Sequence, residues 1–90
     1  MAELPPRLDE LRLRRFAWRI RRGLLENDLV LSRFLAARDG HVSEAEAAAL
    51  DRLLDLTDPE LLDLILARKE PEGELAAPEI VRMVGLLRAC

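Results

Sequence analysis

The sequence predicts an all-α fold, a compact single-domain bundle of five short helices, and three observations lead to this prediction. Leu, Ala, Arg and Glu dominate the composition, whereas Tyr is absent and aromatic residues make up only 3% of the chain. Apolar residues recur with the spacing of an amphipathic helix in several separate stretches. Proline, glycine and capping residues separate these stretches. The 90 residues suit one domain, residues 1–90, with residues 1–7 as a flexible lead-in and residues 68–78 as a loop.

The first helix is predicted over residues 8–22 and has two different faces. One face is apolar and is expected to lie on the core; it carries Leu13, Phe16, Ala17, Ile20 and Leu24. The opposite face carries Leu11 and Trp18 among the arginines at positions 7, 14, 15 and 22. Tryptophan and arginine are enriched at binding surfaces, which indicates that this face meets a partner. The alternative is that Trp18 packs beneath the C-terminal helix.

Gly23 follows this helix at a point where a glycine reduces stability. Inside a helix, glycine is about 1 kcal/mol less favourable than alanine, so it indicates a turn or a partner that approaches the backbone closely. Arg22 precedes it, and Glu26 follows three residues later. We therefore take Arg22, Gly23 and Glu26 as the candidate functional patch. The alternative for Glu26 is structural, because an acidic residue in the first turn of a helix complements the helix dipole.

The second helix is predicted over residues 25–37, where apolar residues occupy almost every side and indicate burial on several sides. A turn at residues 38–41 separates it from the third helix, which is expected to end near residue 56. Ser43 and Glu46 have the spacing of a capping box at the start of this third helix. Its inward face is predicted to comprise Ala47, Leu50, Leu53 and Leu54.

The fourth helix is expected to begin at Asp58 as the N-cap, with Pro59 at the first helical position. Its inner face is predicted to comprise Leu61, Leu62, Ile65 and Leu66. Two prolines and a glycine then mark the loop at residues 68–78. The last helix is predicted over residues 79–89, with an inward face of Ile80, Val81, Val84 and Leu87.

Charge is distributed unevenly along the chain. Residues 1–22 carry seven arginines against three acidic residues, a net charge of +4, whereas residues 23–90 carry seven basic and fourteen acidic residues, a net charge of −7. A basic first helix on an acidic body can steer a charged partner. It also leaves open a small nucleic-acid-binding protein that uses this helix, although the acidic body makes a weak nucleic-acid footprint. A helical scaffold or dimer module that uses Leu11 and Trp18 as its contact is a third possibility.

The sequence contains no recognisable pattern of the residues needed for catalysis or metal binding. No glycine-rich phosphate loop is present, and no Ser or Cys has a recognisable activating base. His41 is the only histidine and has no partner ligands at metal spacing, and Cys90 is the only cysteine. We therefore expect no enzyme activity, no metal and no tightly bound cofactor. Without an apolar run of about 18 residues or a secretory signal pattern, we expect a cytoplasmic protein.

Residues 21–35, RRGLLENDLVLSRFL, together with the Ser43–Glu46 capping box and the run LLDLTDPELLDLI, resemble the small succinate dehydrogenase assembly factors, also called flavinators. The resemblance covers about residues 14–66. The hallmark of that family is an Arg-Gly-x-x-Glu motif, which here is Arg22-Gly23-Leu24-Leu25-Glu26. This chain departs from the common pattern with Leu24 after the glycine and with an Ala36-Ala37-Arg38 stretch near the end of the second helix.

The resemblance implies a five-helix fold and a role in the covalent attachment of FAD to the flavoprotein subunit of succinate dehydrogenase, with the fumarate reductase subunit as a further client. It implies that Arg22, Gly23 and Glu26 contact that subunit, and it extends to Arg15 and Trp18 because they share the outer face of the first helix. The chain would act on FAD held by the client and would be a monomer when free. The nucleic-acid-binding alternative remains open at this point.

Overall fold

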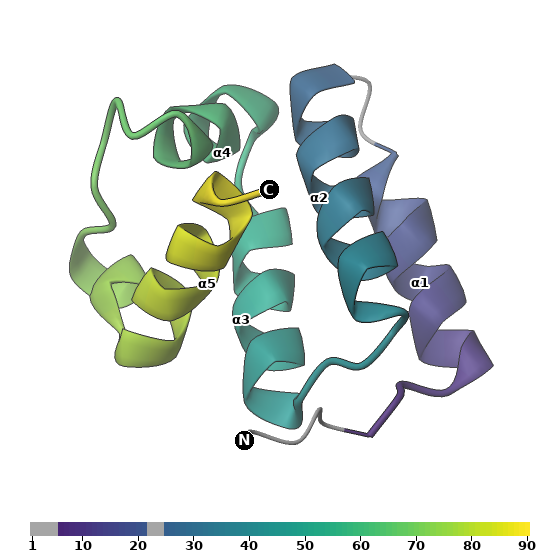
Figure 1. Ribbon diagram of the computed structural model, residues 1–90. Coiled ribbons are helices and arrows are strands. Elements are labelled where there is room, and N and C mark those ends of the chain that lie inside the picture. The colour runs from purple at the N-terminus through teal and green to yellow at the C-terminus, as the bar shows by residue number, and fades with distance from the viewer. Residues whose placement is uncertain (1–5, 22–24) are drawn as a thin grey trace.

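Five α-helices and one short 3-10 helix make up the part of the chain that the structure, a computed structural model, describes, namely residues 6–21 and 25–90. In chain order they are α1 (Glu10–Ile20), α2 (Leu25–Arg38), α3 (Glu44–Leu54), α4 (Asp58–Ile65), η1 (Gly73–Ala76) and α5 (Pro78–Arg88) (Figure 1). The prediction of an all-α fold is confirmed. Within the described ranges, no helix is both long enough and apolar enough to cross a membrane.

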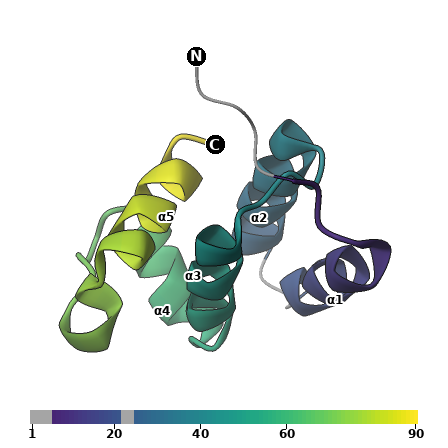
Figure 2. The same ribbon diagram turned by 90° about the horizontal axis from the view of Figure 1, so that it is seen from below.

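α3 stands in the middle of the molecule, with α1 and α2 on one side and α4 and α5 on the other (Figures 1 and 2). α5 packs along α3, whereas α2 packs against α1, α4 and α5. α1 and α2 run antiparallel, so the end of α1 and the start of α2 lie at the same end of the molecule (Figure 1). This end therefore presents the two chain segments that flank the candidate patch.

The core is mainly aliphatic, as the composition predicts. Its fully buried side chains come from four helices and include Leu31, Leu50, Leu53, Leu61, Met83 and Leu87. Each such side chain contributes about 1.5–3 kcal/mol through removal of apolar surface from water. α1 adds Phe16 and Ile20 to this core. The bundle is thus held together mainly by α2 to α5, with α1 packed on its side.

Two capping boxes fix the starts of α3 and α4. The predicted box at α3 is confirmed: the Glu46 backbone N–H donates to Ser43 Oγ at 3.0 Å, and the Ser43 N–H donates to Glu46 Oε1 at 3.0 Å. The prediction of Asp58 as the N-cap of α4 is wrong, because Thr57 caps the helix through the same reciprocal bonds with Glu60. Asp58 is then the first helical residue. A Thr-x-x-Glu pair satisfies two backbone donors, whereas an Asp cap alone satisfies one.

The turn between α2 and α3 is tied to the segment before α1. The Leu8 N–H donates to the Gly40 carbonyl at 2.9 Å, and Arg7 Nε donates to the Asp39 carbonyl at 3.1 Å. Gly40 has a φ of +77°, and a Cβ there would lie 3.1 Å from a Leu13 methyl carbon. Glycine suits this position because it accepts the positive φ and leaves room for the crossing segment.

α2 is less buried than the sequence predicts. Leu25 is 65% exposed and Leu29 is 45% exposed, and Ala36 and Ala37 are exposed as well. The prediction of burial on several sides is wrong, because α1, α4 and α5 cover only the side of α2 that carries Leu31 and Phe34. The outer side of α2 therefore presents apolar side chains to solvent.

Several predicted inward faces differ from the observed ones by one or two positions. In α1, Ala17 is exposed; in α4, Leu64 is buried while Leu66 is exposed; in α5, Met83 is buried while Val81 is exposed. A run of leucines fits two alternative faces of α4 equally well, so its pattern alone does not choose between them. In α5, Met83 completes the spacing i, i+3, i+4, i+7 that begins at Ile80.

Candidate functional site

α1 turns its apolar and aromatic outer residues towards solvent. The Asp9 side chain caps the helix by accepting a hydrogen bond from the Arg12 N–H at 2.8 Å, and Phe16 and Ile20 bury the inner side. Because Trp18 lies on the opposite side of the helix from these two residues, it is 76% exposed. The alternative in which Trp18 packs beneath the C-terminal helix is wrong. Large exposed aromatic side chains of this kind are typical anchors for a protein partner.

A second side of α1 faces α3 and is neutralised by ion pairs. Arg12 donates to Glu44, and Arg19 donates from its two terminal nitrogens to Asp51 and Asp55 at 2.8 Å each. The hydrogen bond to Glu44 raises the pKa of Arg12 above its ordinary value, against a smaller opposing effect of desolvation. These pairs could not be predicted from the sequence, since they join residues at least 32 positions apart.

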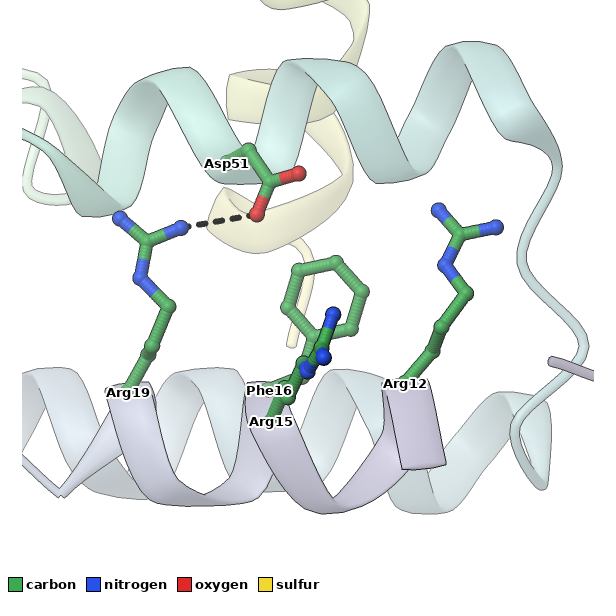
Figure 3. Close-up of a pocket in the computed structure, with 5 residues that line it drawn as sticks. All are labelled: Arg12, Arg15, Phe16, Arg19 and Asp51. Atoms are coloured by element: carbon green, nitrogen blue, oxygen red, sulfur yellow. Dashed lines mark hydrogen bonds and ion pairs between the residues drawn. The ribbon is translucent and has the colours of Figure 1, made fainter. Parts of the chain in front are cut away.

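Arg15 lies between these two paired arginines and behaves differently. It makes no hydrogen bond or ion pair with the residues that the structure describes, although it is exposed on the same helix. Figure 3 shows Arg12, Arg15 and Arg19 rising from α1 around the Phe16 ring, with Asp51 facing them from α3. Together these five residues line a solvent-open hollow of about 200 Å³. The hollow is smaller than the usual 300–1,000 Å³ of a small-molecule pocket.

Glu26 and Asn27 occupy the first turn of α2 and have opposite surroundings. Glu26 is exposed and makes no ion pair within residues 6–21 and 25–90, so its carboxylate can accept hydrogen bonds from outside. Asn27 is completely buried, and its side-chain nitrogen donates to the Asp58 carbonyl at 3.0 Å. This bond joins the start of α2 to the start of α4. The burial of Asn27 was not predicted, although its helical spacing from Leu31 and Phe34 places this polar residue on the core face of α2.

The predicted site residues that the structure describes lie on α1 and in the first turn of α2. Arg15 and Trp18 lie one turn apart on α1, and Glu26 lies in the first turn of the antiparallel α2 (Figure 1). No described contact joins Glu26 to either of them. Arg22 and Gly23 lie outside the described residues, so their predicted roles remain predictions.

The described part of the chain contains no arrangement of side chains suited to metal binding or to nucleophilic catalysis. No group of three or more His, Cys, Asp or Glu side chains in those ranges could hold a metal ion. Cys90 is exposed, and its Sγ lies 3.4 Å from the Leu86 carbonyl rather than beside a base. The chemistry that the site offers is thus recognition through guanidinium, carboxylate and aromatic groups.

Comparison with known proteins gives a consistent result. The profile of the family described as "Flavinator of succinate dehydrogenase" matches residues 14–88. A protein of Ralstonia nicotianae named "FAD assembly factor SdhE" is 47% identical over 81 residues, which cover 90% of this chain and 85% of that protein. A protein of Legionella pneumophila with the same name is 36% identical over 83 residues, which cover 92% of this chain and 99% of that protein. No solved structure matches the chain.

Proposed function

The chain belongs to the family of flavinators of succinate dehydrogenase, and we propose that it binds the flavoprotein subunit of that enzyme and promotes covalent attachment of FAD to it. The flavoprotein subunit of fumarate reductase is a second client of the same kind. In this proposal the chain contributes binding and not catalysis, and it acts on FAD that the client holds.

The exposed outer side of α1 is the observation that carries the proposal. A 76% exposed tryptophan in the last turn of α1 provides an apolar anchor for another protein. Arg15 lies one turn before it on α1 and Glu26 lies in the first turn of α2, and neither forms an ion pair with a residue that the structure describes. Because neither charge is compensated within the described residues, both are available to a partner. A surface that combines an exposed aromatic ring with charges of both signs suits a protein partner whose own surface is partly polar and partly apolar.

Binding alone is sufficient for the proposed role. A helper protein that binds one conformation of the flavoprotein more tightly than another shifts the population towards that conformation. If FAD and its acceptor side chain are aligned in the favoured conformation, the attachment becomes faster without any acid or base from the helper. The size of the effect is limited by the difference between the two affinities. Glu26 accepts hydrogen bonds from the client in this proposal, and Trp18 fills an apolar depression on it.

Covalent flavin in the client provides a direct test. A strain that lacks this protein is complemented with the wild type, with Glu26→Ala or with Glu72→Ala, and flavin fluorescence is read at the flavoprotein band on a denaturing gel. We expect the band to fade on deletion, to return with the wild type and to remain faint with Glu26→Ala. Glu72→Ala is the matched control, because it removes an exposed carboxylate outside α1 and α2. An unchanged band after deletion would refute the proposal.

A further inference from the structure

The ion pairs between α1 and α3 form a regular ladder. Arg12 pairs with Glu44 and Arg19 pairs with Asp51, two contacts with the same separation of 32 positions, and Arg19 also pairs with Asp55. The two helices therefore run parallel along this seam, with arginines on one side and carboxylates on the other. Glu44 and Asp51 of α3 and its C-cap residue Asp55 thus each have an arginine partner from α1.

Arg15 is the arginine for which this ladder provides no carboxylate. Glu44, Ala48, Asp51 and Asp55 follow one another along one face of α3 at spacings of three and four residues. Ala48 is the only member of this stripe without a carboxylate, and it lies between Glu44 and Asp51. The guanidinium of Arg15 thus remains unpaired beside a hollow whose walls hold two paired arginines, Arg12 and Arg19 (Figure 3).

We propose that the hollow between α1 and α3 is a carboxylate-binding site, in which Arg15 pairs with an acidic side chain of the flavoprotein subunit; this rests on the proposed function. The volume of about 200 Å³ suits one side chain. The Phe16 ring lines the hollow and reduces the exposure of the incoming group to water, which strengthens a charge-assisted hydrogen bond. The wall residues Arg12 and Arg19 are already fixed by α3 and therefore hold the shape of the hollow before the partner arrives.

The charges around the hollow favour a single carboxylate over a polyanion. Arg12 and Arg19 already form ion pairs with carboxylates, so Arg15 is the one arginine lining the hollow that has no such partner among the described residues, whereas a chain of phosphates requires several cations. Trp18 lies three residues after Arg15 and Leu11 four residues before it, and both are exposed. The predicted counterpart on the flavoprotein is consequently an acidic residue flanked by apolar residues.

The decisive experiment measures the dissociation constant of the full-length chain with the purified flavoprotein subunit. Arg15→Ala removes the cation, whereas Ala48→Glu leaves Arg15 in place and supplies an internal carboxylate that competes for it. We expect either substitution to raise the dissociation constant about tenfold or more. The matched controls are Arg82→Ala, which removes an exposed arginine of α5 that forms no ion pair with any described residue, and Ala45→Glu, which adds the same charge to another face of α3. Both controls are expected to stay within about twofold of the wild type.

The outcomes separate this proposal from the function on which it rests. Wild-type affinity in both Arg15→Ala and Ala48→Glu, with covalent flavin still lost on deletion of the protein, would overturn the carboxylate site alone. If Ala48→Glu does not fold, which circular dichroism reveals, the comparison of Arg15→Ala with Arg82→Ala decides. If Arg15→Ala and Arg82→Ala raise the dissociation constant equally, the effect comes from net charge, and this result would also overturn the carboxylate site.

Discussion

Glu46 is a nearly buried carboxylate that remains charged because of its neighbours. It is 8% exposed, and Arg38 donates to its two oxygens at 3.1 and 2.8 Å. Burial alone would raise the pKa of Glu46, but the hydrogen bonds from Arg38 and Ser43 outweigh it and hold the pKa below the ordinary 4.5. Arg38 also lies over the Phe34 ring, 5.2 Å from its centroid. This pair fixes the end of α2 against the start of α3.

The lowered pKa of Glu46 predicts an acid-dependent loss of stability. A carboxyl group with a depressed folded-state pKa stabilises the protein above its unfolded pKa, and this contribution disappears as the pH falls through the folded-state pKa. We expect Glu46→Gln to lower the free energy of unfolding by about 2 kcal/mol at pH 7, since it leaves Arg38 without its charged partner. Urea titrations at pH 7 and pH 3 should show the difference from wild type shrinking at the lower pH. A difference that is the same at both values would contradict the assignment.

Substitution of Trp18 should weaken partner binding without weakening the fold. Because its side chain is 76% exposed, Trp18→Ala should change the midpoint of thermal unfolding very little. The same substitution should raise the dissociation constant for the flavoprotein subunit about tenfold or more, as expected for an aromatic anchor. Ile20→Ala, which removes a buried side chain from the same helix, is the control and should lower the thermal midpoint clearly. A large loss of stability in Trp18→Ala would place Trp18 in the core instead.

At the scale of the element, the start of α4 distinguishes two neighbouring candidate caps. Thr57 Oγ1 accepts the hydrogen bond from the Glu60 N–H at 3.3 Å, whereas Asp58 is the first helical residue. Thr57→Ala should therefore lower the free energy of unfolding by about 1 kcal/mol. Thr57→Ser should stay close to the wild type, because serine keeps the hydroxyl group that caps the helix. Chemical denaturation of the two variants checks this order, and equal losses in Thr57→Ser and Thr57→Ala would contradict the role of the hydroxyl group.

The elements also show where sequence patterns are sufficient and where they fail. The five helices and the Ser43–Glu46 box follow from local spacing and capping chemistry, which act within a few residues. The exposure of Leu25 and Leu29 could not be predicted in this way. A helix with apolar residues on most sides has the same pattern whether its outer side packs on the core or binds a partner. The ladder between α1 and α3 could not be predicted either, since it depends on which helices become neighbours.

At the scale of the whole molecule, the ion pairs that form on folding decide which charges stay uncompensated at the surface. The first helix reads as strongly basic, but the ion pairs of Arg12 and Arg19 with α3 neutralise much of the side that faces the bundle. These ion pairs leave fewer uncompensated arginines on α1 for contact with phosphates, which weakens the nucleic-acid-binding alternative. The unpaired charges that remain, Arg15 and Glu26 among them, suit a partner that carries both signs.

The unequal burial of the helices has a consequence for hydrogen exchange. α1 buries only Phe16 and Ile20, and its ion pairs with α3 are only partly buried, whereas α3 buries several aliphatic side chains. Local opening should therefore require less free energy in α1 than in α3. We expect amide protons of α1 to exchange with deuterium first, and to become protected when the flavoprotein subunit binds. The helix that makes the first contact with a partner would then be the one that can adjust most readily to it.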